Sequence, residues 1–546
     1  MKSTVIMALA AFAATAPAPA GAANSAGSSS SADVPGRLVV TYQNTVSAMN
    51  VGEQFSNSEI MEVGSESLEA VRAQLESHPD VARVENDYWV SNPVLPSPPR
   101  PADSLVGALS VSHSDTVNPA AFVPSDPGFR SQIAWEAPQT GRAGVQDILS
   151  AYLRVTPQRR VRIGVVDSGF YRLQDLDYAQ GYNFASADGF GPRFLENEVD
   201  PNCLTAHGTG VSGVFGAVTN NGTGIAGIVE TDIIAARALS CDSEGRVRGV
   251  LTDTALAIRW LAGDPSVANA PRLQQPVDVI NASLGGQVSR CPGYLQEAID
   301  YAYSRGILTV VSAGNAGGDA ANTAPANCSR VVTVAAVRAS GDLADFSNTG
   351  ADVSVAALGS EVLSLDRFGR LTFWDGTSFS APVVAGIAGL LKQSSTENLT
   401  PANITDLLRS SARLIRQSDG SRIPVVDAKA AMARVANDSG NRVAVIAPFL
   451  NDPERCQTEA YRLNNPLALS LDRVYEVTAN NLSLGSAGER YTVLRSTGSG
   501  GKEVIAQSLE PVFLIKNVNP DTESLWIDVC DSSGQNCRLN QSQALL

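Results

Sequence analysis

The segment Val161-Arg-Ile-Gly-Val-Val-Asp-Ser-Gly169 is an aliphatic run that ends in an acidic residue and a glycine. Nearly continuous aliphatic runs are typical of strands buried on both faces of a parallel sheet. Further runs of this kind lie at 232–235, 277–280, 307–311 and 331–334. Helical periodicity separates some of them, at 251–261 and at 295–303, where Gly306 follows as an expected cap. The alternation predicts an α/β fold with a doubly wound, mainly parallel sheet flanked by helices.

The chain on either side of this α/β region, which we place at 124–440, has other patterns. Residues 1–22 contain Lys2, an apolar stretch and the small-residue run Ala20-Gly-Ala22, which predicts a signal peptide. The apolar stretch falls short of the roughly 20 residues that span a bilayer, so secretion, extracellular or periplasmic, is favoured over a membrane anchor. Residues 23–123 combine a small α+β pattern with a proline-rich linker. Residues 441–546 alternate short apolar stretches with turn residues, which predicts a β-sandwich-like accessory domain.

Composition excludes some partners and indicates a compartment. The 546 residues include 40 Lys and Arg against 55 Asp and Glu, and the net charge of −15 argues against nucleic acid as a partner. Seven cysteines suit an oxidising compartment, and we predict the disulfides Cys203–Cys241 and Cys291–Cys328, each of which brackets one βα unit. No CxxC pair supports a metal cluster instead. The pairing of the other three is left open: Cys456, Cys530 and Cys537.

Three segments combine a reactive side chain with glycines near an expected strand end, where open α/β sheets bind their ligands. They contain Asp167, His207 and Ser378. A serine hydroxyl becomes a nucleophile when a base removes its proton, imidazole titrates near neutral pH, and a carboxylate fixes the imidazole tautomer. Asn315 ends a fourth such segment and has an amide that can donate to an oxyanion. Each residue alone could be a cap, a turn residue or a structural histidine, so the prediction rests on their conjunction.

Five segments, in order, resemble the motifs of the subtilisin-like serine proteases (subtilases, peptidase family S8), and the resemblance covers residue 124 to about 435. The segments are Val165-Val-Asp-Ser-Gly169, His207-Gly-Thr-Gly-Val-Ser-Gly213, Asn281-Ala-Ser-Leu-Gly-Gly286, Ser312-Ala-Gly-Asn315 and Gly376-Thr-Ser-Phe-Ser-Ala-Pro382. The resemblance implies a secreted serine endopeptidase that acts through an acyl-enzyme and needs no cofactor for its chemistry. Asp167 would orient the base, His207 would be the base and acid, Ser378 the nucleophile and Asn315 the oxyanion donor.

Residues 37–90 look like the propeptide of this family, which is an intramolecular inhibitor until it is cut away. We therefore expect an autoprocessed zymogen, with the cut between about residue 91 and residue 124. Of the three histidines, His78 lies in the expected propeptide and His113 in the segment expected to be cut. His207 is then the imidazole that remains in the mature enzyme.

The resemblance also indicates where substrate binds. Ser283, Leu284 and Gly285 look like the segment whose backbone pairs with an extended peptide. Ser312, Ala313 and Gly314 would form a wall of the first specificity pocket. The loop that follows, 316–325, has Asp319 as its one charge, so we expect a roomy, mostly apolar pocket rather than strict cleavage after basic residues.

A structural calcium ion is an expectation of the same kind. The loop Thr219-Asn-Asn-Gly-Thr-Gly-Ile225 is similar in position to a calcium loop of the family. Asn221 would be a ligand, with Asp175 or Asp177 contributing, because Ca²⁺ prefers oxygen ligands. A solvated turn is an equally good interpretation of this loop.

Two other function classes remain as alternatives, for a chain that we expect to be a monomer. One is a binding protein that keeps the fold without turnover, which would be expected to lack part of the catalytic set. The other is an esterase that uses the same three side chains. Gly210, Ser212 and the segment Ala356-Ala-Leu358-Gly359 depart from the usual family pattern, and none of these departures removes a catalytic atom.

Overall fold

The structure of the protein is a computed structural model. It describes residues 33–43, 54–55, 57–63, 68–92, 97–102, 124–138, 141–153, 155, 159–267, 270–395 and 398–436, and beyond these the backbone of strands between residues 442 and 539. The predicted signal peptide lies outside the described residues. The chain forms two compact units, Met1–Met432 and Ala433–Leu546.

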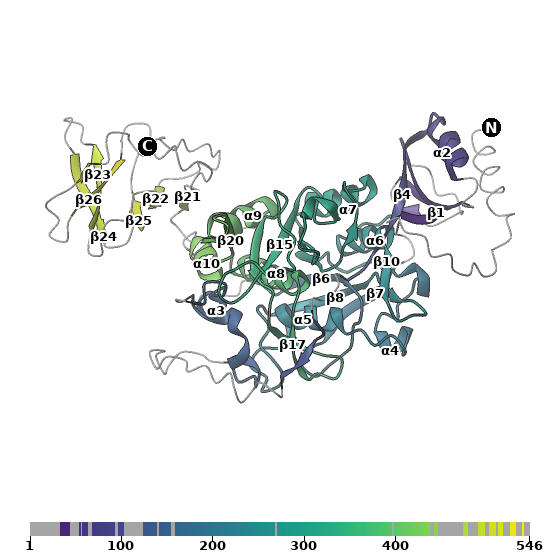
Figure 1. The fold of residues 1–546 in the computed structure, drawn as a ribbon, viewed down its shortest axis with the longest axis horizontal. Coiled ribbons are helices and arrows are strands. Elements are labelled where there is room, and N and C mark those ends of the chain that lie inside the picture. The colour runs from purple at the N-terminus through teal and green to yellow at the C-terminus, as the bar shows by residue number, and fades with distance from the viewer. Residues whose placement is uncertain are drawn as a thin grey trace. The chain divides into compact units, whose positions relative to one another are not determined.

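Nine strands of the first unit form its central sheet (Figure 1). From one edge to the other they are β19 (Arg413–Arg416), β20 (Arg422–Val425), β16 (Val355–Leu358), β15 (Val331–Val337), β13 (Leu308–Ser312), β11 (Val279–Ala282), β6 (Val161–Asp167), β8 (Thr231–Arg237) and β7 (Tyr178–Asn183). All neighbouring pairs are parallel except β19 with β20. The doubly wound α/β prediction is therefore confirmed for this part of the chain.

Helices cover both faces of this sheet. Helices α5 (His207–Gly216) and α8 (Thr377–Ser394) pack on one face, and α6 (Leu251–Leu261) and α7 (Gly293–Ser304) belong to the other layer (Figure 1). The shorter helices are α3 (Ile148–Tyr152), α4 (Glu196–Val199), α9 (Pro401–Ser410) and α10 (Ala428–Ala436). The first strand, β6, lies inside the sheet, with β8 on one side and β11 on the other. The strand order therefore reverses at β6, because the chain first adds strands on one side of it and then on the other. Sheets of this kind form ligand sites at such a reversal, and β6 ends there in Asp167.

The N-terminal part adds a second sheet that runs into the α/β domain. Strands β2 (Gln54–Phe55), β3 (Ser58–Glu62), β1 (Asp33–Tyr42) and β4 (Val81–Val90) are antiparallel, and α2 (Leu68–Glu76) packs on β4 and β1. Beyond β4 the same sheet continues through β10 (Val247–Val250) and β9 (Ser240–Cys241) of the α/β domain (Figure 1). The last strand of the N-terminal part is thus an added strand on the domain that follows it.

The second unit consists of two sheets in its described strands. One contains β21 (Arg442–Val445), β22 (Arg473–Thr478) and β25 (Val512–Lys516). The other contains β24 (Lys502–Ser508), β23 (Arg490–Ser496), β26 (Leu525–Cys530) and β27 (Arg538–Leu539). The predicted β character is present, and the sandwich itself stays a prediction.

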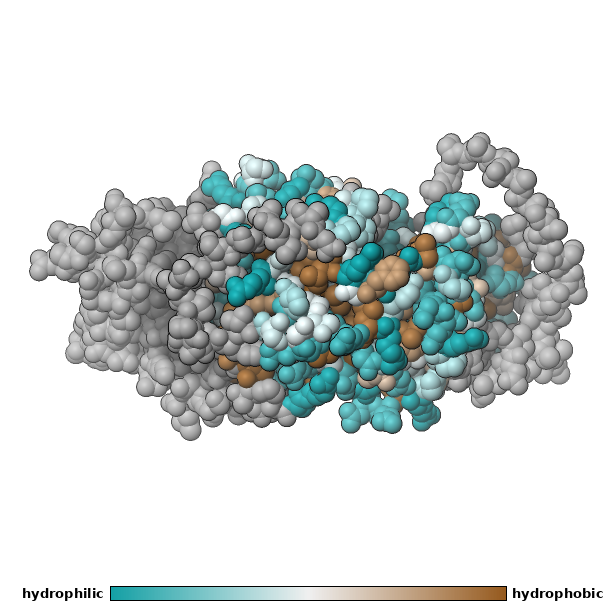
Figure 2. Space-filling model, turned by 90° about the horizontal axis from the view of Figure 1, so that it is seen from below, coloured by the Kyte–Doolittle hydropathy of each residue, from teal (hydrophilic) through white to brown (hydrophobic). Residues whose placement is uncertain are grey.

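The surface of the first unit combines polar and apolar regions. Figure 2 shows one face, with hydrophobic residues along the middle of the described part and hydrophilic residues around them. The exposed large hydrophobic side chains among the described residues are Leu153, Leu204, Val218 and Phe368. Leu204 and Phe368 line a cleft of about 1020 Å³ that also contains His207. No helix that the structure describes is long and apolar enough to cross a bilayer.

Candidate active site

Asp167 and His207 meet at the carboxyl end of the central sheet. Asp167 is the last residue of β6 and His207 is the first residue of α5. The Nδ1 atom of His207 lies 2.8 Å from Oδ1 of Asp167, and both side chains are buried. The carboxylate also accepts the N–H of Ser168 at 2.7 Å. A buried carboxylate in this position fixes the imidazole tautomer and stabilises the imidazolium.

A tight turn after Asp167 holds the strand against the histidine helix. The N–H of Gly208 donates to the carbonyl of Ser168 at 2.7 Å, and the N–H and hydroxyl of Thr209 donate to the carbonyl of Gly169. Gly169 has φ +66°, and a Cβ there would lie 2.7 Å from the carbonyl oxygen of Thr205. Glycine is therefore required at this position by both conformation and space.

Ser378 lies at the N-terminal end of α8 on the same side of the sheet. It is the second residue of that helix, so its N–H has no acceptor within the helix. The ring of the next residue, Phe379, lies 5.5 Å from the imidazole ring of His207. Among the described residues, neither Ser378 Oγ nor His207 Nε2 has a hydrogen-bond partner, although both atoms are buried. Without substrate, the hydrogen bond between a nucleophile and its base is often long or poorly aligned, and it tightens only when substrate is bound.

The Asn315 amide is oriented by Thr377, the residue before Ser378. The N–H and the hydroxyl of Thr377 donate to Asn315 Oδ1 at 2.9 and 2.7 Å. The hydroxyl of Thr377 in turn accepts the N–H of Gly314 at 3.1 Å. With its oxygen bound in this way, the amide directs its N–H groups elsewhere. A side-chain amide N–H and a backbone N–H at a helix start are donor types that can stabilise an oxyanion.

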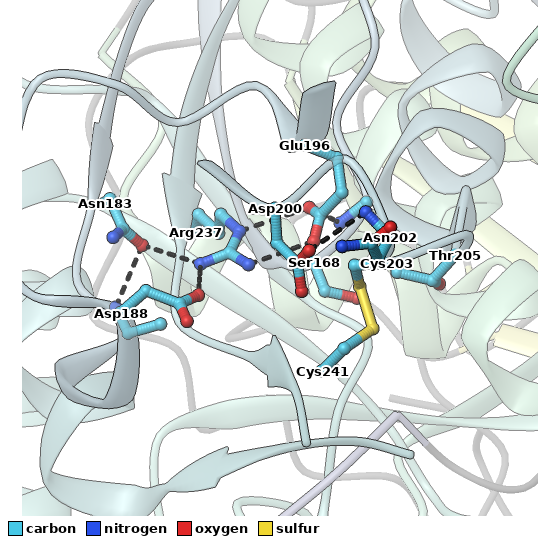
Figure 3. Close-up of polar contacts among 12 residues, drawn as sticks. Ser168, Asn183, Asp188, Glu196, Asp200, Asn202, Cys203, Thr205, Arg237 and Cys241 are labelled. Atoms are coloured by element: carbon cyan, nitrogen blue, oxygen red, sulfur yellow. Dashed lines mark hydrogen bonds and ion pairs between the residues drawn. A yellow bond between two sulfur atoms is a disulfide. The ribbon is translucent and has the colours of Figure 1, made fainter. Parts of the chain in front are cut away.

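A buried ion pair supports the turn after Asp167 (Figure 3). Glu196 accepts the N–H of Gly169 at 2.9 Å and pairs with the guanidinium of Arg237 at 2.9 and 3.1 Å. Both side chains of the pair are fully buried, and Arg237 also contacts Asn183 and Asp188. Burial raises the pKa of Glu196, and the Arg237 guanidinium partly offsets this effect. The loop after β6 is therefore fixed to the end of β8 by charge.

Both predicted disulfides are formed, Cys203–Cys241 and Cys291–Cys328. The first lies beside Glu196 and four residues before His207 (Figure 3). The two sulfur atoms and a carboxylate oxygen of Glu196 lie within 4.8 Å of one another, a spacing that a metal ion could use. The sulfurs are bonded to each other and the carboxylate is paired with Arg237, so this cluster has a structural role.

The cleft contains a segment of the protein's own chain as an added strand. Ser91 and Gly285 exchange two backbone hydrogen bonds, at 3.1 and 2.9 Å. On the other side of the same segment, Trp89 and Val90 pair with Val250 and Gly249 of β10. The predicted peptide-pairing residue Gly285 therefore pairs with an extended chain. Leu284 is buried in the core, and the Ser283 hydroxyl donates to the carbonyl of Ser378 at 2.8 Å.

The next residue of this segment, Asn92, contacts the Asp167 carboxylate. Its Nδ2 donates to Asp167 Oδ1 at 2.8 Å and to the carbonyl of Ser283 at 3.3 Å. Its Oδ1 accepts the hydroxyl of Ser168 at 2.7 Å. The amide is thus bound on both its donor and its acceptor side.

The expected pocket wall, Ser312, Ala313 and Gly314, is buried at the end of β13. Gly314 has φ +103°, and a Cβ there would lie 2.4 Å from the Nδ2 atom of Asn348. Asn348 accepts the N–H groups of Ala316 and Gly318 and so supports the loop that follows. The Asp319 carboxylate accepts the N–H of Ala321.

Two departures from the family pattern lie in buried helix α5. A Cβ at Gly210 would lie 3.1 to 3.2 Å from the rings of Trp374 and Phe379. These two rings stack with centroids 4.9 Å apart, and they occupy the space that a side chain at Gly210 would use. Ser212 is buried as well.

The expected calcium residues are only partly brought together. Asn221 donates to Asp175 at 2.8 Å, whereas Asp177 is exposed and pairs with Arg172 at 2.6 Å. Asp126, which the sequence analysis did not include, accepts the N–H groups of Asn220 and Asn221. Burial, with a smaller contribution from the charge of Asp126, raises the pKa of Asp175 to about 6. Carboxylate and amide oxygens are ligand types that suit Ca²⁺. In this structure the Asn221 amide turns its NH2 group to Asp175, and its oxygen accepts the N–H of Thr223.

Sequence reasoning missed the residues that act through long-range contacts. These are Asn92, Asp126, Ser168, Glu196, Arg237 and Thr377. Thr377 and Ser168 adjoin predicted catalytic residues, which is the one signal that could have indicated them. The others are distant along the chain from the groups they contact.

Comparisons of the sequence with known proteins all indicate the same protein family. A family model described as the subtilase family, peptidase S8, matches residues 158–442. An extracellular protease of Xanthomonas campestris pv. campestris is 34% identical over 366 residues, which cover 62% of this chain and 60% of that protein. Thermitase of Thermoactinomyces vulgaris is 36% identical over 220 residues, or 40% of this chain and 71% of that protein.

A solved structure gives the same result. The chain is similar, with a TM-score of 0.50 and 32% identity, to a structure of proteases from Pseudoalteromonas arctica PAMC 21717. The similarity covers 57% of this chain and 99% of that one. The chain spans about 60% of the length of the first curated relatives that it matches.

Proposed function

The chain belongs to the subtilase family, and on this basis we propose that it is a secreted serine endopeptidase made as an autoprocessed zymogen. The observation that supports this most strongly is the Asp167–His207 hydrogen bond of 2.8 Å in a cleft where Gly285 pairs with an extended chain. An acid–imidazole pair alone would fit several hydrolases. The backbone pairing favours a peptide substrate over a small ester.

In this proposal Ser378 Oγ attacks the carbonyl carbon of the scissile bond and gives its proton to His207 Nε2. Asn315 Nδ2 and the N–H of Ser378 donate to the oxyanion as it forms. His207 then protonates the leaving amine, and the acyl group remains on Ser378. A water molecule repeats the sequence with His207 as base, which releases the acid product and restores the hydroxyl.

The N-terminal part would act as the intramolecular inhibitor. Support comes from acidic side chains of β4 at the N-terminal ends of two helices, where anions are favoured. Glu85 accepts the N–H of Gly293 at the start of α7 at 2.7 Å. Asp87, fully buried, accepts the N–H and hydroxyl of Thr252 near the start of α6. These contacts join β4 to the starts of α6 and α7, which supports a role of this part as a bound inhibitor.

Structural calcium is part of the proposal. Asp126, Asp175 and Asn221 would bind the ion through oxygen atoms. An ion there would stabilise the loop that these side chains join, and it would take no part in the reaction. Asp177 is left out of the ligand set because it pairs with Arg172.

Hydrolysis of casein and of a peptide anilide by the full chain tests the activity. The wild-type chain should shorten on folding and then degrade casein. N-terminal sequencing of the product locates the maturation cut. A stable full-length chain that hydrolyses only small esters would contradict the proposal and support the esterase alternative.

A further inference from the structure

A second segment of the protein's own chain lies in the same cleft as residues 89–92. Strand β5 (Arg100–Pro101) pairs antiparallel with β18 (Leu371–Trp374), which forms a hairpin with β17 (Val362–Leu365). Pro99 and Pro101 line the cleft of about 1020 Å³ together with Trp89, Val90 and His207. Ala102, directly after β5, is only 1% exposed. The chain is therefore bound in one cleft at two places, before residue 93 and after residue 96.

The two places contact different residues near Ser378. Asn92 contacts Asp167 and the carbonyl of Ser283, and Ser283 contacts Ser378. The hydroxyl of Ser97 donates at 2.5 Å to Asp375, which lies three residues before Ser378. In the proposed maturation, a first cut between Asn92 and Ser97 would put residues Ser97–Pro101 on the leaving side of the bond.

Beside β5, two carboxylates face a basic side chain of the bound segment. Arg100 Nη2 lies 3.2 Å from Glu361 Oε1 and 3.7 Å from Asp375 Oδ2. Asp375 is largely buried and also accepts the N–H of Glu361 at 2.9 Å. Glu361 has φ +56°, which is unusual for a residue with a side chain, and its hydrogen bond to Asp375 supports this conformation. The hydrogen bond to Asp375 thus holds Glu361 in place beside β5.

We propose that β18, Glu361 and Asp375 form a recognition edge for the leaving side of the substrate, which takes an extended segment with a basic side chain. Residues Ser97–Pro101 occupy this edge in the precursor. The main chain is bound by pairing with β18, and the guanidinium or ammonium group is bound by the two carboxylates. The inference rests on the proposed function and adds a substrate preference to it.

The precursor itself provides the first test. We measure the rate at which the full chain shortens after refolding, for wild type and for Arg100→Ala, Arg100→Lys and Arg100→Glu. Because the pair is partly exposed, Arg100→Ala should slow the cut about two- to five-fold. Arg100→Glu should slow it more, since it faces two like charges, and Arg100→Lys should be close to wild type. The matched control is Arg160→Ala, which removes a similarly exposed guanidinium from a pair with Asp232 outside the cleft.

A second arm tests recognition of separate substrates. This arm uses the Arg100→Ala enzyme, in which the protein's own arginine no longer occupies the two carboxylates. Peptides that extend past their scissile bond and carry Arg downstream of it should be cut about two- to five-fold faster than the same peptides with Ala. Glu361→Gln should reduce this difference, because one of the two carboxylates loses its charge. The control Arg160→Ala should keep the difference and should leave unchanged the hydrolysis of an anilide that ends at the scissile bond.

The outcomes separate the two claims. If the wild-type chain neither shortens nor cuts casein, the proposed function fails. If it does both, but Arg100→Ala and Arg100→Glu process at the wild-type rate or the Arg peptides show no advantage that depends on Glu361, the recognition edge is wrong and the protease assignment stands.

Discussion

Replacing Arg237 with methionine should destabilise the protein strongly, because it leaves Glu196 as an unpaired charge in the interior. Both side chains are fully buried, and Arg237 forms two hydrogen bonds to the Glu196 carboxylate. Removing one partner of a buried pair costs about 3–5 kcal/mol, whereas replacing both by groups of similar volume is often nearly neutral. We therefore expect a loss of about 3–5 kcal/mol for Arg237→Met and a much smaller loss for the double variant Glu196→Gln, Arg237→Met.

The loss should also depend on pH in a defined direction. Burial already raises the pKa of Glu196, and removal of the guanidinium raises it further. A protonated carboxyl needs no charged partner, so the penalty is full at neutral pH and shrinks as the pH falls through the raised pKa. The Gly169 N–H bond to residue 196 remains possible in both charge states.

The assay is equilibrium unfolding in urea, at pH 7 and pH 5, of the full chain with Ser378→Ala, which prevents self-digestion. The unfolding free energy of this parent is compared with that of the single and double variants. A single variant within about 1 kcal/mol of its parent at pH 7, or a double variant as unstable as the single one, would refute the reasoning.

Three further predictions follow from the site. Asn315→Ala should lower kcat on a peptide anilide about 10²–10³-fold with little change in KM, because it removes a donor used in the transition state; equal losses in kcat and in substrate affinity would contradict this role. Asn92→Asp should slow the first cut of the precursor at least about ten-fold, because the new carboxylate would face that of Asp167 with a repulsion of about 4 kcal/mol at an effective dielectric constant of 20. The isosteric Asn92→Leu should have a smaller effect. Equal rates for the two variants would refute the charge argument. With a chelator present, the contribution of Asp175 to stability should be complete below about pH 4 and lost as the pH rises through about 6, because its folded pKa of about 6 exceeds the ordinary value of about 3.9. In a thermal melt, added calcium should remove this loss. Identical melts with and without calcium would count against the ion.

The sequence predicts the sheet well, because buried strands have a local pattern. It also singles out Asp167 and His207, which the structure brings within 2.8 Å of each other. The helix expected at 251–261 is α6 with the same bounds. The strand expected at 277–280 is displaced and runs from Val279 to Ala282. The N–H of Val277 bonds to the carbonyl of Leu261 at the end of α6, so this apolar residue belongs to the connection.

The supporting groups of the site could not be predicted in the same way. Asn92 contacts Asp167 across 75 residues, and Arg237 contacts Glu196 across 41. A buried glutamate or arginine has no local pattern that separates it from an exposed one, because its partner is supplied by the tertiary fold. The calcium loop illustrates the same limit, since Asp126 reaches it from 94 residues away.

The most direct test of the central claim compares the wild-type chain with Ser378→Ala on casein, with urea unfolding to confirm that the variant is folded. The account predicts that the wild-type chain shortens itself and degrades casein, while the variant stays full-length and inactive. A folded Ser378→Ala variant that shortens itself or degrades casein at the wild-type rate would contradict it.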